Sequence, residues 1–204
     1  MKKHRDSYHH GNLAESLLDA VEDLATRFGL EAVSLRACAK QLGVSPSSAF
    51  RHYPDKRALL TAFATRALQQ LSAALAEAAT NHTTFRPIAL AYVRYAIEKP
   101  ALFRAMWRED TIYAQDEQYR AATATLTRQL TAGFGDALRD CDPDHLSDQE
   151  LLVWSTLHGL AVLFVDGPLN QVADDATRLT SAEHVIDRLI PTLDLNSTPP
   201  APTA

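Results

Sequence analysis

The stretch that decides the fold is QLGVSPSSAFRHYPDK, residues 41–56. Gly43 interrupts an apolar run, and glycine is the usual residue where a tight turn needs a positive φ. Ser45 and Pro46 then match the preferred start of a helix, with serine as the N-cap and proline at the first helical position. Pro54 ends that helix after roughly eight residues. The stretch therefore predicts a very short helix just after a glycine turn.

A second short helix is expected before the turn. Ser34 is a suitable N-cap for LRACAKQL, residues 35–42. Ala39 is small where the two helices would cross, and Ala49 is small on the inner face of the later helix. Two short helices joined by a glycine turn form a helix-turn-helix. An ordinary helical hairpin uses the same turn, but the later helix has very little apolar surface to bury, which favours a helix that reads DNA.

The remainder of the chain also has helical spacing, with no sustained alternation of apolar and polar residues. A first helix is predicted by one apolar face, and Gly29 is placed to close it; the face consists of Leu13, Leu17, Val21, Leu24 and Phe28. Further helices are expected over 55–80, 85–98, 101–109, 115–139, 148–166 and 175–194. The proline-rich residues 196–204 are expected to be a disordered tail. The predicted fold class is all-α.

The charge of the chain is unevenly distributed. The 204 residues carry 20 Lys and Arg against 25 Asp and Glu, a formal net charge of −5. Residues 1–60 carry nine basic and seven acidic residues, a balance of +2, so the remainder carries eleven against eighteen, a balance of −7. A basic front end on an acidic chain is consistent with a nucleic-acid partner.

The composition is that of a cytoplasmic protein. The two cysteines, Cys38 and Cys141, provide no disulfide framework and suit a reducing compartment. The charged N-terminus has no apolar segment of the kind found in secretory signals. The longest apolar stretch, 151–165, would span roughly 22 Å as a helix, against a bilayer core of about 30 Å. We therefore expect a cytoplasmic location with no membrane partner.

Residues 10–70 resemble the DNA-binding domain of the TetR/AcrR family of bacterial transcription regulators. The resemblance lies in LLDAVEDLATRFGLEAVSLRACAKQLGVSPSSAFRHYPDKRALL, residues 17–60, which follow the family pattern without a gap. The remainder resembles a C-terminal regulatory domain of one branch of the family, through Trp154, His158 and Gly159. The resemblance implies a basic N-terminal arm (1–9), a DNA-binding domain (10–70) with its helix-turn-helix at about 34–53, a regulatory and dimerisation domain (71–195) and the tail (196–204).

The resemblance also assigns roles in DNA binding. Hydroxyl, guanidinium, imidazole and ammonium groups are the donors that meet phosphates and base edges. Many relatives have a tyrosine where this chain has Phe50, so one hydroxyl contact with phosphate is lost. An arginine at position 51 is suited to reading guanine. The implied DNA contacts are Ser34, Arg36, Ser45, Ser47, Ser48, Phe50, Arg51, His52, Tyr53 and Lys56.

Two further surfaces are predicted in the C-terminal part. Aromatic residues at helical spacing are either core or the wall of a ligand pocket; the candidates for a pocket are Tyr95, Phe103, Met106, Trp107, Trp154 and His158, with polar help from Arg104 or Thr123. The helix 148–166 is apolar on nearly every side and therefore needs cover on every side. We expect a homodimer through 148–166 and 175–194, with Leu157, Leu163, Phe164, Val185, Ile186 and Leu189 at the interface.

Catalytic and metal chemistry are not indicated. The sequence has no nucleophile elbow, zinc-protease motif, phosphate loop or glycine-rich dinucleotide turn, and it has seven glycines in all. His4, His9 and His10 are not accompanied by cysteines or carboxylates at ligand spacing, and an arm that touches DNA is the preferred interpretation. Cys38 is interpreted as a small core residue. We expect no enzyme activity, cofactor or metal.

Together these features predict a sequence-specific transcription regulator, a repressor that a small molecule releases from a palindromic double-stranded DNA operator. Two alternatives stay open from the residues: a DNA-binding regulator gated by a protein partner with no small ligand, and a helical-bundle enzyme. The sequence does not identify the effector, the operator or the regulated genes.

Overall fold

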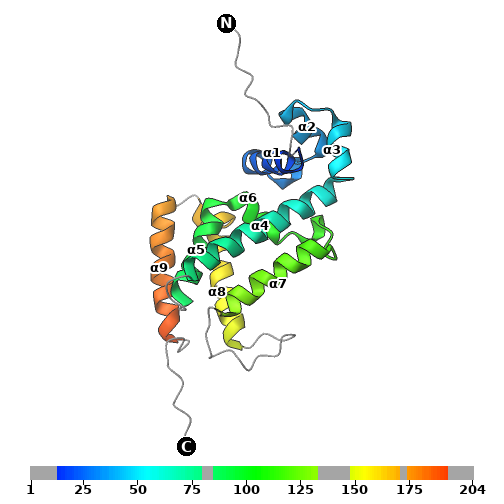
Figure 1. Ribbon diagram of the computed structural model, residues 1–204. Coiled ribbons are helices and arrows are strands. Elements are labelled where there is room, and N and C mark those ends of the chain that lie inside the picture. Colours follow the sequence, from blue (N-terminus) through cyan, green and yellow to red (C-terminus); the bar gives the residue numbers. More distant parts are fainter. Residues whose placement is uncertain (1–12, 80–84, 133–147, 171–173, 193–204) are drawn as a thin grey trace, which may run out of the picture.

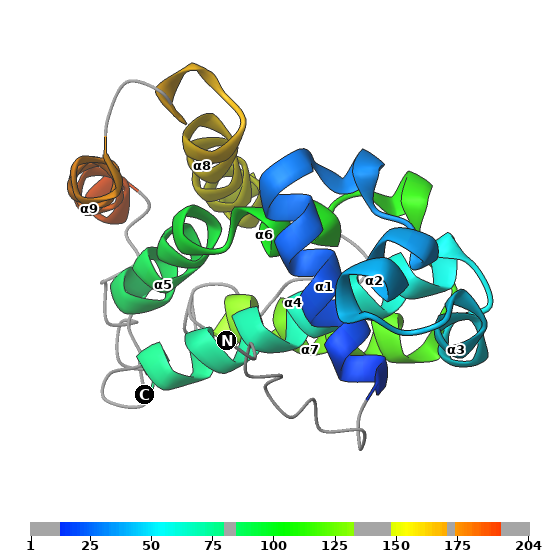
Figure 2. The same cartoon turned by 90° about the horizontal axis from the view of Figure 1, so that it is seen from above.

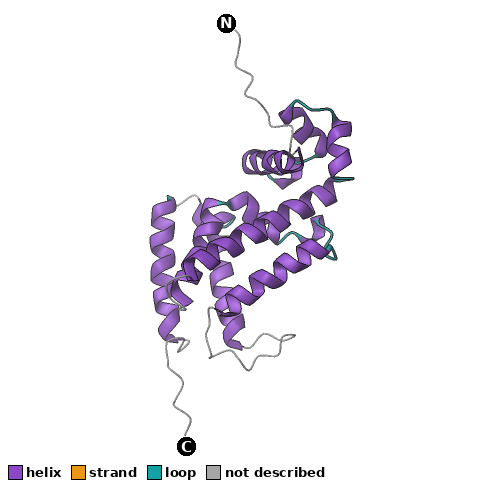
Figure 3. Ribbon diagram, in the orientation of Figure 1, coloured by secondary structure: helices purple, strands orange, loops and turns teal. Residues whose placement is uncertain are grey.

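The computed structural model describes residues 13–79, 85–132, 148–170 and 174–192. All regular structure in these segments is helical, which confirms the predicted fold class (Figure 3). The α-helices are α1 (Leu13–Phe28), α2 (Leu35–Leu42), α3 (Pro46–His52), α4 (Lys56–Ala79), α5 (Phe85–Glu98), α6 (Pro100–Met106), α7 (Glu117–Ala132), α8 (Asp148–Val165) and α9 (Asp175–Thr192). The short 3-10 turns η1 (Leu30–Ala32), η2 (Glu109–Thr111) and η4 (Pro168–Asn170) lie between them.

The first three helices form a unit at one end of the molecule, with α3 at its outer edge (Figures 1 and 2). α1 packs against both α2 and α3, and α4 continues from this unit into the rest of the chain. The predicted domain boundary at residue 70 falls inside α4. The N-terminal unit and the regulatory helices therefore share one continuous helix.

The regulatory helices pack on α4 and on one another. α5, α6 and α7 pack on α4, while α8 and α9 both pack on α5 (Figure 2). The core between them holds large side chains that are at most 2% exposed, among them Phe63, Leu68, Tyr92, Phe103 and Met106. Each such side chain contributes about 1.5–3 kcal/mol when it is fully buried, so the core fixes the position of the helices that carry the candidate sites.

Polar contacts fix the N-terminal unit against the regulatory helices. The guanidinium of Arg66 on α4 lies 2.6 Å from Asp19 and 3.2 Å from Glu22 on α1, and its side chain is only 14% exposed. The ammonium of Lys99 lies 3.4 Å from Glu22. Because Lys99 comes just before α6, these ion pairs connect α1 both to α4 and to the start of α6.

Three details differ from the sequence-based expectation. Phe28 was placed on the buried face of the first helix, but it is the last residue of α1 and is 60% exposed, because the chain turns away at Gly29 with a φ of 82°. The helix expected over 101–109 ends at Met106, because Trp107 leaves helical geometry. The helix expected over 115–139 begins at Glu117 and is described as far as Ala132.

Candidate functional sites

The helix-turn-helix is built by two caps and a glycine turn. The hydroxyl of Ser34 accepts a hydrogen bond from the backbone N–H of Ala37 at 3.1 Å, which caps α2. Gly43 follows α2 in the left-handed conformation, with φ 68° and ψ 26°. Ala39 and Ala49 are fully buried, as expected for small residues where α2 and α3 pack together. The predicted turn is therefore present, and it orients α3.

The surface of α3 is polar, and its side chains form hydrogen bonds with one another. The Ser45 hydroxyl caps the helix by accepting from the N–H of Ser48 at 3.2 Å, and it lies 2.9 Å from the Ser47 hydroxyl and 2.8 Å from the Ser48 hydroxyl. Arg51 Nη2 donates to the Ser48 hydroxyl at 3.2 Å. Ala49 is the one buried residue of α3. A helix with so little buried surface is not a core element, and its exposed donors suit DNA.

The residues predicted to meet DNA divide into two groups. One group is exposed on the motif: Arg36, Ser45, Ser47, Phe50, Arg51 and His52. Ser34 and Ser48 are half-buried and cap or brace their helices. The Tyr53 hydroxyl donates to the carbonyl of Ala14 at 3.4 Å, and the Lys56 ammonium donates to the carbonyl of Glu31 at 3.0 Å. Tyr53 and Lys56 thus support the motif from within the chain, and a DNA contact by either stays a prediction.

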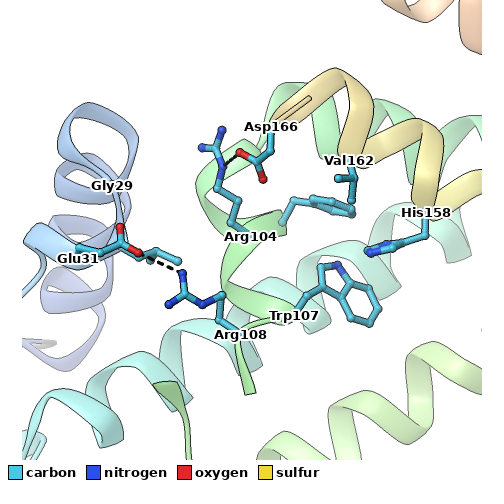
Figure 4. Close-up of a pocket in the computed structure, with 10 residues that line it drawn as sticks. Gly29, Glu31, Arg104, Trp107, Arg108, His158, Val162 and Asp166 are labelled. Atoms are coloured by element: carbon cyan, nitrogen blue, oxygen red, sulfur yellow. Dashed lines mark hydrogen bonds and ion pairs between the residues drawn. The ribbon is translucent and has the colours of Figure 1, made fainter. Parts of the chain in front are cut away.

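A cleft of about 440 Å³ lies between the N-terminal unit and the regulatory helices (Figure 4). Its volume is in the range of small-molecule sites. Its walls come from η1 and the residue before it, from α6 and the residues after it, and from α8 and the residue after it: Gly29, Leu30, Glu31, Phe103, Arg104, Trp107, Arg108, His158, Val162 and Asp166. A second hollow of about 310 Å³ shares Leu30, Glu31 and Arg108 and adds Lys56 and Arg57.

Ion pairs line the cleft. Arg108 Nη1 lies 3.0 Å from Glu31 and so joins the regulatory part to the N-terminal unit, while Arg108 Nε and Nη2 lie 3.0 and 3.2 Å from the two oxygens of Asp110. Arg104 Nε donates to Asp166 at 2.5 Å. The hydrogen bonds that Arg108 donates to Asp110 and, to a lesser extent, to Glu31 raise the pKa of Arg108 above its ordinary value. Arg108 is therefore held by Asp110 on one side and by Glu31 on the other.

The inner wall of the cleft is aromatic. Ring centroids of Trp107 and His158 are 4.9 Å apart, those of Phe103 and His158 are 5.6 Å apart, and Trp154 lies 5.7 Å from Trp107. Trp107 is 39% exposed although it belongs to this cluster. Figure 4 shows the indole of Trp107 and the imidazole of His158 turned toward each other. The cluster therefore offers a planar apolar ligand a surface on which to pack.

The proton of His158 is fixed by a tyrosine behind it. The Tyr92 hydroxyl lies 3.0 Å from His158 Nδ1. Burial raises the pKa of Tyr92 and lowers the pKa of His158 from 6.5, so both groups are neutral at pH 7. Tyr92 is fully buried, and a buried hydroxyl that donated to nothing would cost about 1–3 kcal/mol. The hydroxyl therefore donates to Nδ1, and His158 carries its proton on Nε2.

The structure brings together half of the predicted pocket residues. Phe103, Trp107 and His158 line the cleft, and Trp154 packs behind Trp107. Met106 is 1% exposed in the core, and the Tyr95 hydroxyl donates to the carbonyl of Ala67 at 3.0 Å. Neither residue lines the cleft, because both point into the packing between α4 and the helices around it. Sequence reasoning missed Glu31, Arg108 and Asp166, since the cleft joins segments far apart in the chain.

The predicted dimer residues need correction. Leu157, Phe164 and Ile186 are 4%, 3% and 0% exposed, so they are core residues of this chain and do not face a partner. Leu163 and Val185 are 41% and 36% exposed, and Leu189 is half-buried. The error arose because a helix that is apolar on every side does not reveal which side its own domain covers.

An exposed apolar surface does run along α8. We call it the α8 strip; it consists of Leu151, Leu152 and Leu163, each 41–56% exposed, whereas Val162 lines the cleft. Gly159 lies in the same part of the helix, and a Cβ added there would meet nothing within 4 Å. Exposed large apolar residues that lie along one helix are candidates for an interaction surface.

Metal binding and membrane insertion find no support in the described residues. Within them, no three histidine, cysteine, aspartate or glutamate side chains are grouped to hold a metal ion. No helix there is long and apolar enough to cross a membrane. The arm with His4, His9 and His10, the residue Cys141 and the tail 196–204 lie outside the described residues.

The fold and the polar third helix define a helix-turn-helix transcription regulator, and comparison with known families identifies which one. Residues 17–63 match the bacterial regulatory proteins of the tetR family, and residues 85–189 match the tetracyclin repressor-like C-terminal domain. The chain therefore belongs to the TetR family of DNA-binding transcription regulators, which are not enzymes.

Solved structures and one curated protein are similar to the chain. A protein of unknown function from Rhodococcus sp. RHA1 is 29% identical, with a TM-score of 0.69 over 90% of this chain and 97% of that one. The TetR family regulator PfmR from Thermus thermophilus shares the fold at 22% identity, with a TM-score of 0.63 over 86% and 97% of the two chains. The uncharacterised HTH-type transcriptional regulator YobS of Bacillus subtilis is 31% identical over 98 residues, 47% of this chain and 51% of YobS. That match thus spans about half of YobS.

Proposed function

We propose that this TetR-family regulator is a homodimeric repressor that binds a palindromic DNA site in the cytoplasm and is released from it by a small molecule. The observation that carries the proposal is α3, a helix of seven residues whose one buried residue is Ala49 and whose outer face presents Ser47 and Arg51. A single helix of this length contacts few base pairs, so two copies related by a two-fold axis are needed to select a site.

The α8 strip supports the dimer. Leu151, Leu152 and Leu163 are 41–56% exposed, so they leave apolar surface on α8 that the described part of the chain does not cover. A second α8 packed on this strip, with Val185 and Leu189 of α9 beside it, would make a four-helix interface. Gly159 would let the two helices approach closely, because nothing occupies the space above its Cα. In this proposed interface, the α8 strip with Val185 and Leu189 replaces Leu157, Phe164 and Ile186, which were predicted from the sequence and are buried in the core.

The cleft supports ligand control. It is large enough for a small molecule and touches both the N-terminal unit and the regulatory helices. A ligand that prefers one relative position of these two parts would shift the population toward dimers whose paired α3 helices no longer match the spacing of the half-sites. His158 contributes to the wall, and Trp154 packs behind Trp107 and supports it.

Selection of sites from a pool of random duplexes tests the proposal. The full-length protein should enrich a two-fold symmetric sequence. The logarithm of its binding constant should fall linearly with the logarithm of the salt concentration, because Arg36 and Arg51 displace counterions from phosphates. A screen for compounds that release the selected duplex should then find a small molecule. Enrichment of no sequence would refute the proposal. A protein that selects a site but is released by no compound in the screen would support gating by a protein partner.

A further inference from the structure

Arg108 has an arrangement that the proposed function does not explain. Asp110 engages its Nε and Nη2 atoms, at 3.0 and 3.2 Å, and so orients the guanidinium from within the regulatory part. The remaining atom, Nη1, is directed across the cleft to Glu31 at 3.0 Å. Glu31 is 74% exposed in this pair. The pair therefore joins a well-oriented cation to a carboxylate that water already surrounds.

An exposed carboxylate is a weak competitor for such a site. Ion pairs in contact with water contribute about 0–1 kcal/mol, so Glu31 can leave Arg108 at little cost. A ligand carboxylate would take the same Nη1 atom, and Asp110 would keep the guanidinium oriented during the exchange. The pair between Glu31 and Arg108 then acts as a latch between the N-terminal unit and the regulatory helices, and ligand binding opens it.

The polar groups deepest in the cleft are hydrogen-bond donors. His158 is half-buried and offers its Nε2–H, and Arg104 is 34% exposed, with its Nη1 atom unpaired among the described residues. The carboxylates of Glu31 and Asp166 are 74% and 50% exposed and stay hydrated at the rim. A bound ligand interacts most strongly with the groups that are least exposed to water. Because the donors are less exposed than the carboxylates, the cleft favours a hydrogen-bond acceptor or an anion over a cation.

The neighbouring hollow also favours an anionic ligand. It begins at the wall made by Glu31 and Arg108, and its charged lining consists of Lys56, Arg57 and Arg108 against Glu31 and Asp110, so cations exceed carboxylates by one. On the opposite side, the indole of Trp107 is 39% exposed and offers an apolar face, while Phe103, 2% exposed, packs against it from behind with its ring tilted by 67°. The cleft therefore combines an aromatic wall with a cationic edge.

We propose that the cleft binds a small aromatic acid, with its ring on the exposed face of Trp107 and its carboxylate on Arg108 Nη1 in place of Glu31, and that this exchange opens the latch to the DNA-binding unit. The inference rests on the proposed ligand control and specifies its ligand class and its switch.

Calorimetric titration of full-length protein with three matched probes tests the ligand class: β-naphthoate, β-naphthamide and β-naphthylmethylammonium. We expect β-naphthoate to bind tightest and the ammonium to bind weakest. Arg108→Gln should weaken binding of β-naphthoate by about 10- to 100-fold, the usual effect of one hydrogen bond to a charged group. Arg86→Gln is the matched control, because Arg86 forms a similar ion pair with Asp187 at 2.6 Å on α5 and α9, away from the cleft.

Glu31→Gln distinguishes exchange at the latch from a purely structural role. This variant removes the competitor and keeps Arg108, so β-naphthoate should bind up to about fivefold tighter, while affinity for the selected duplex falls. General damage to the cleft would instead weaken the binding of β-naphthoate as well as the binding of the duplex. Tighter binding of the ammonium probe, or equal binding of β-naphthoate to wild type and Arg108→Gln, would overturn the ligand class.

The coupling to DNA is measured with the selected duplex. β-Naphthoate should lower the affinity of the wild-type protein for it and should have little effect on Glu31→Gln, whose latch is already open. Binding of β-naphthoate without any change in DNA affinity would overturn the latch. If a screen finds another releasing compound whose affinity the Arg108 and Glu31 variants leave unchanged, ligand control stands and this inference fails.

Discussion

Leu163 on α8 gives the most direct test of the proposed dimer. Complete burial of a leucine side chain contributes about 1.5–3 kcal/mol, and Leu163 is still 41% exposed in the single chain. Covering the rest in a dimer would contribute about 0.6–1.2 kcal/mol per chain, or about 1.2–2.4 kcal/mol for two chains. Leu163→Glu removes this contribution and also desolvates two carboxylates, so we expect dimer dissociation to be favoured at least about tenfold.

Ile186→Glu provides the contrast. Ile186 is 0% exposed and packs inside its own chain, so a glutamate there is an uncompensated buried charge that costs about 3–5 kcal/mol of folding stability. We expect Ile186→Glu to lower the melting temperature strongly, whereas Leu163→Glu should melt like a folded monomer. Phe28→Glu, at an exposed apolar position on α1, is the control for adding a charge away from the α8 strip.

Sedimentation equilibrium over a range of concentrations gives the dimer dissociation constant, and circular dichroism melting reports folding. Leu163→Glu should sediment as a monomer at concentrations where wild type and Phe28→Glu are dimers, and it should lose specific DNA binding. The reasoning is refuted if Leu163→Glu dimerises as tightly as wild type, or if the wild-type protein is itself a monomer at micromolar concentration.

Three further changes probe local features. Ser34→Ala removes the cap of α2 and should lower the free energy of unfolding by about 1 kcal/mol in denaturant titration; an unchanged midpoint would contradict the cap. Gly43→Ala meets no atom within 4 Å but must keep a φ of 68°, so it should cost about 1–2 kcal/mol by strain alone, and a neutral result would show that the turn relaxes. The lowered pKa of His158 means that the unfolded chain binds a proton more readily, so stability should fall as pH drops below about 6.5. His158→Gln should flatten that fall while the exposed control His184→Gln retains it, and equal slopes in melts from pH 7 to pH 5 would count against the buried neutral imidazole.

Local chemistry explains what could be predicted from the sequence. The caps at Ser34 and Ser45, the turn at Gly43 and the stop at Pro54 act through neighbouring backbone atoms, so their residue types specify α2 and α3 without tertiary information. Small residues such as Ala49 also indicated where the two helices pack. These features gave the motif and most of its exposed donors.

The other sites depend on contacts between distant segments. The latch joins Glu31 to Arg108, 77 positions apart, and nothing near either residue in the sequence indicates its partner. Tyr53 and Lys56 carry polar groups that suit DNA, but the packed chain directs them to carbonyls of α1 and η1. The buried and exposed sides of α8 could not be separated because both are apolar, which led to the wrong placement of Leu157 and Phe164.

The most direct test of the central claim, that α3 reads DNA sequence, is a comparison of Arg51→Ala with wild type on the selected duplex and on a random duplex of equal length. An arginine that contacts guanine contributes about 1–3 kcal/mol of discrimination, so Arg51→Ala should weaken binding to the selected duplex by about 5- to 150-fold and binding to the random duplex much less. Arg36→Ala, which removes an exposed cation of α2, should weaken both to a similar degree. If Arg51→Ala weakens both duplexes equally, α3 does not read the sequence and the account is contradicted.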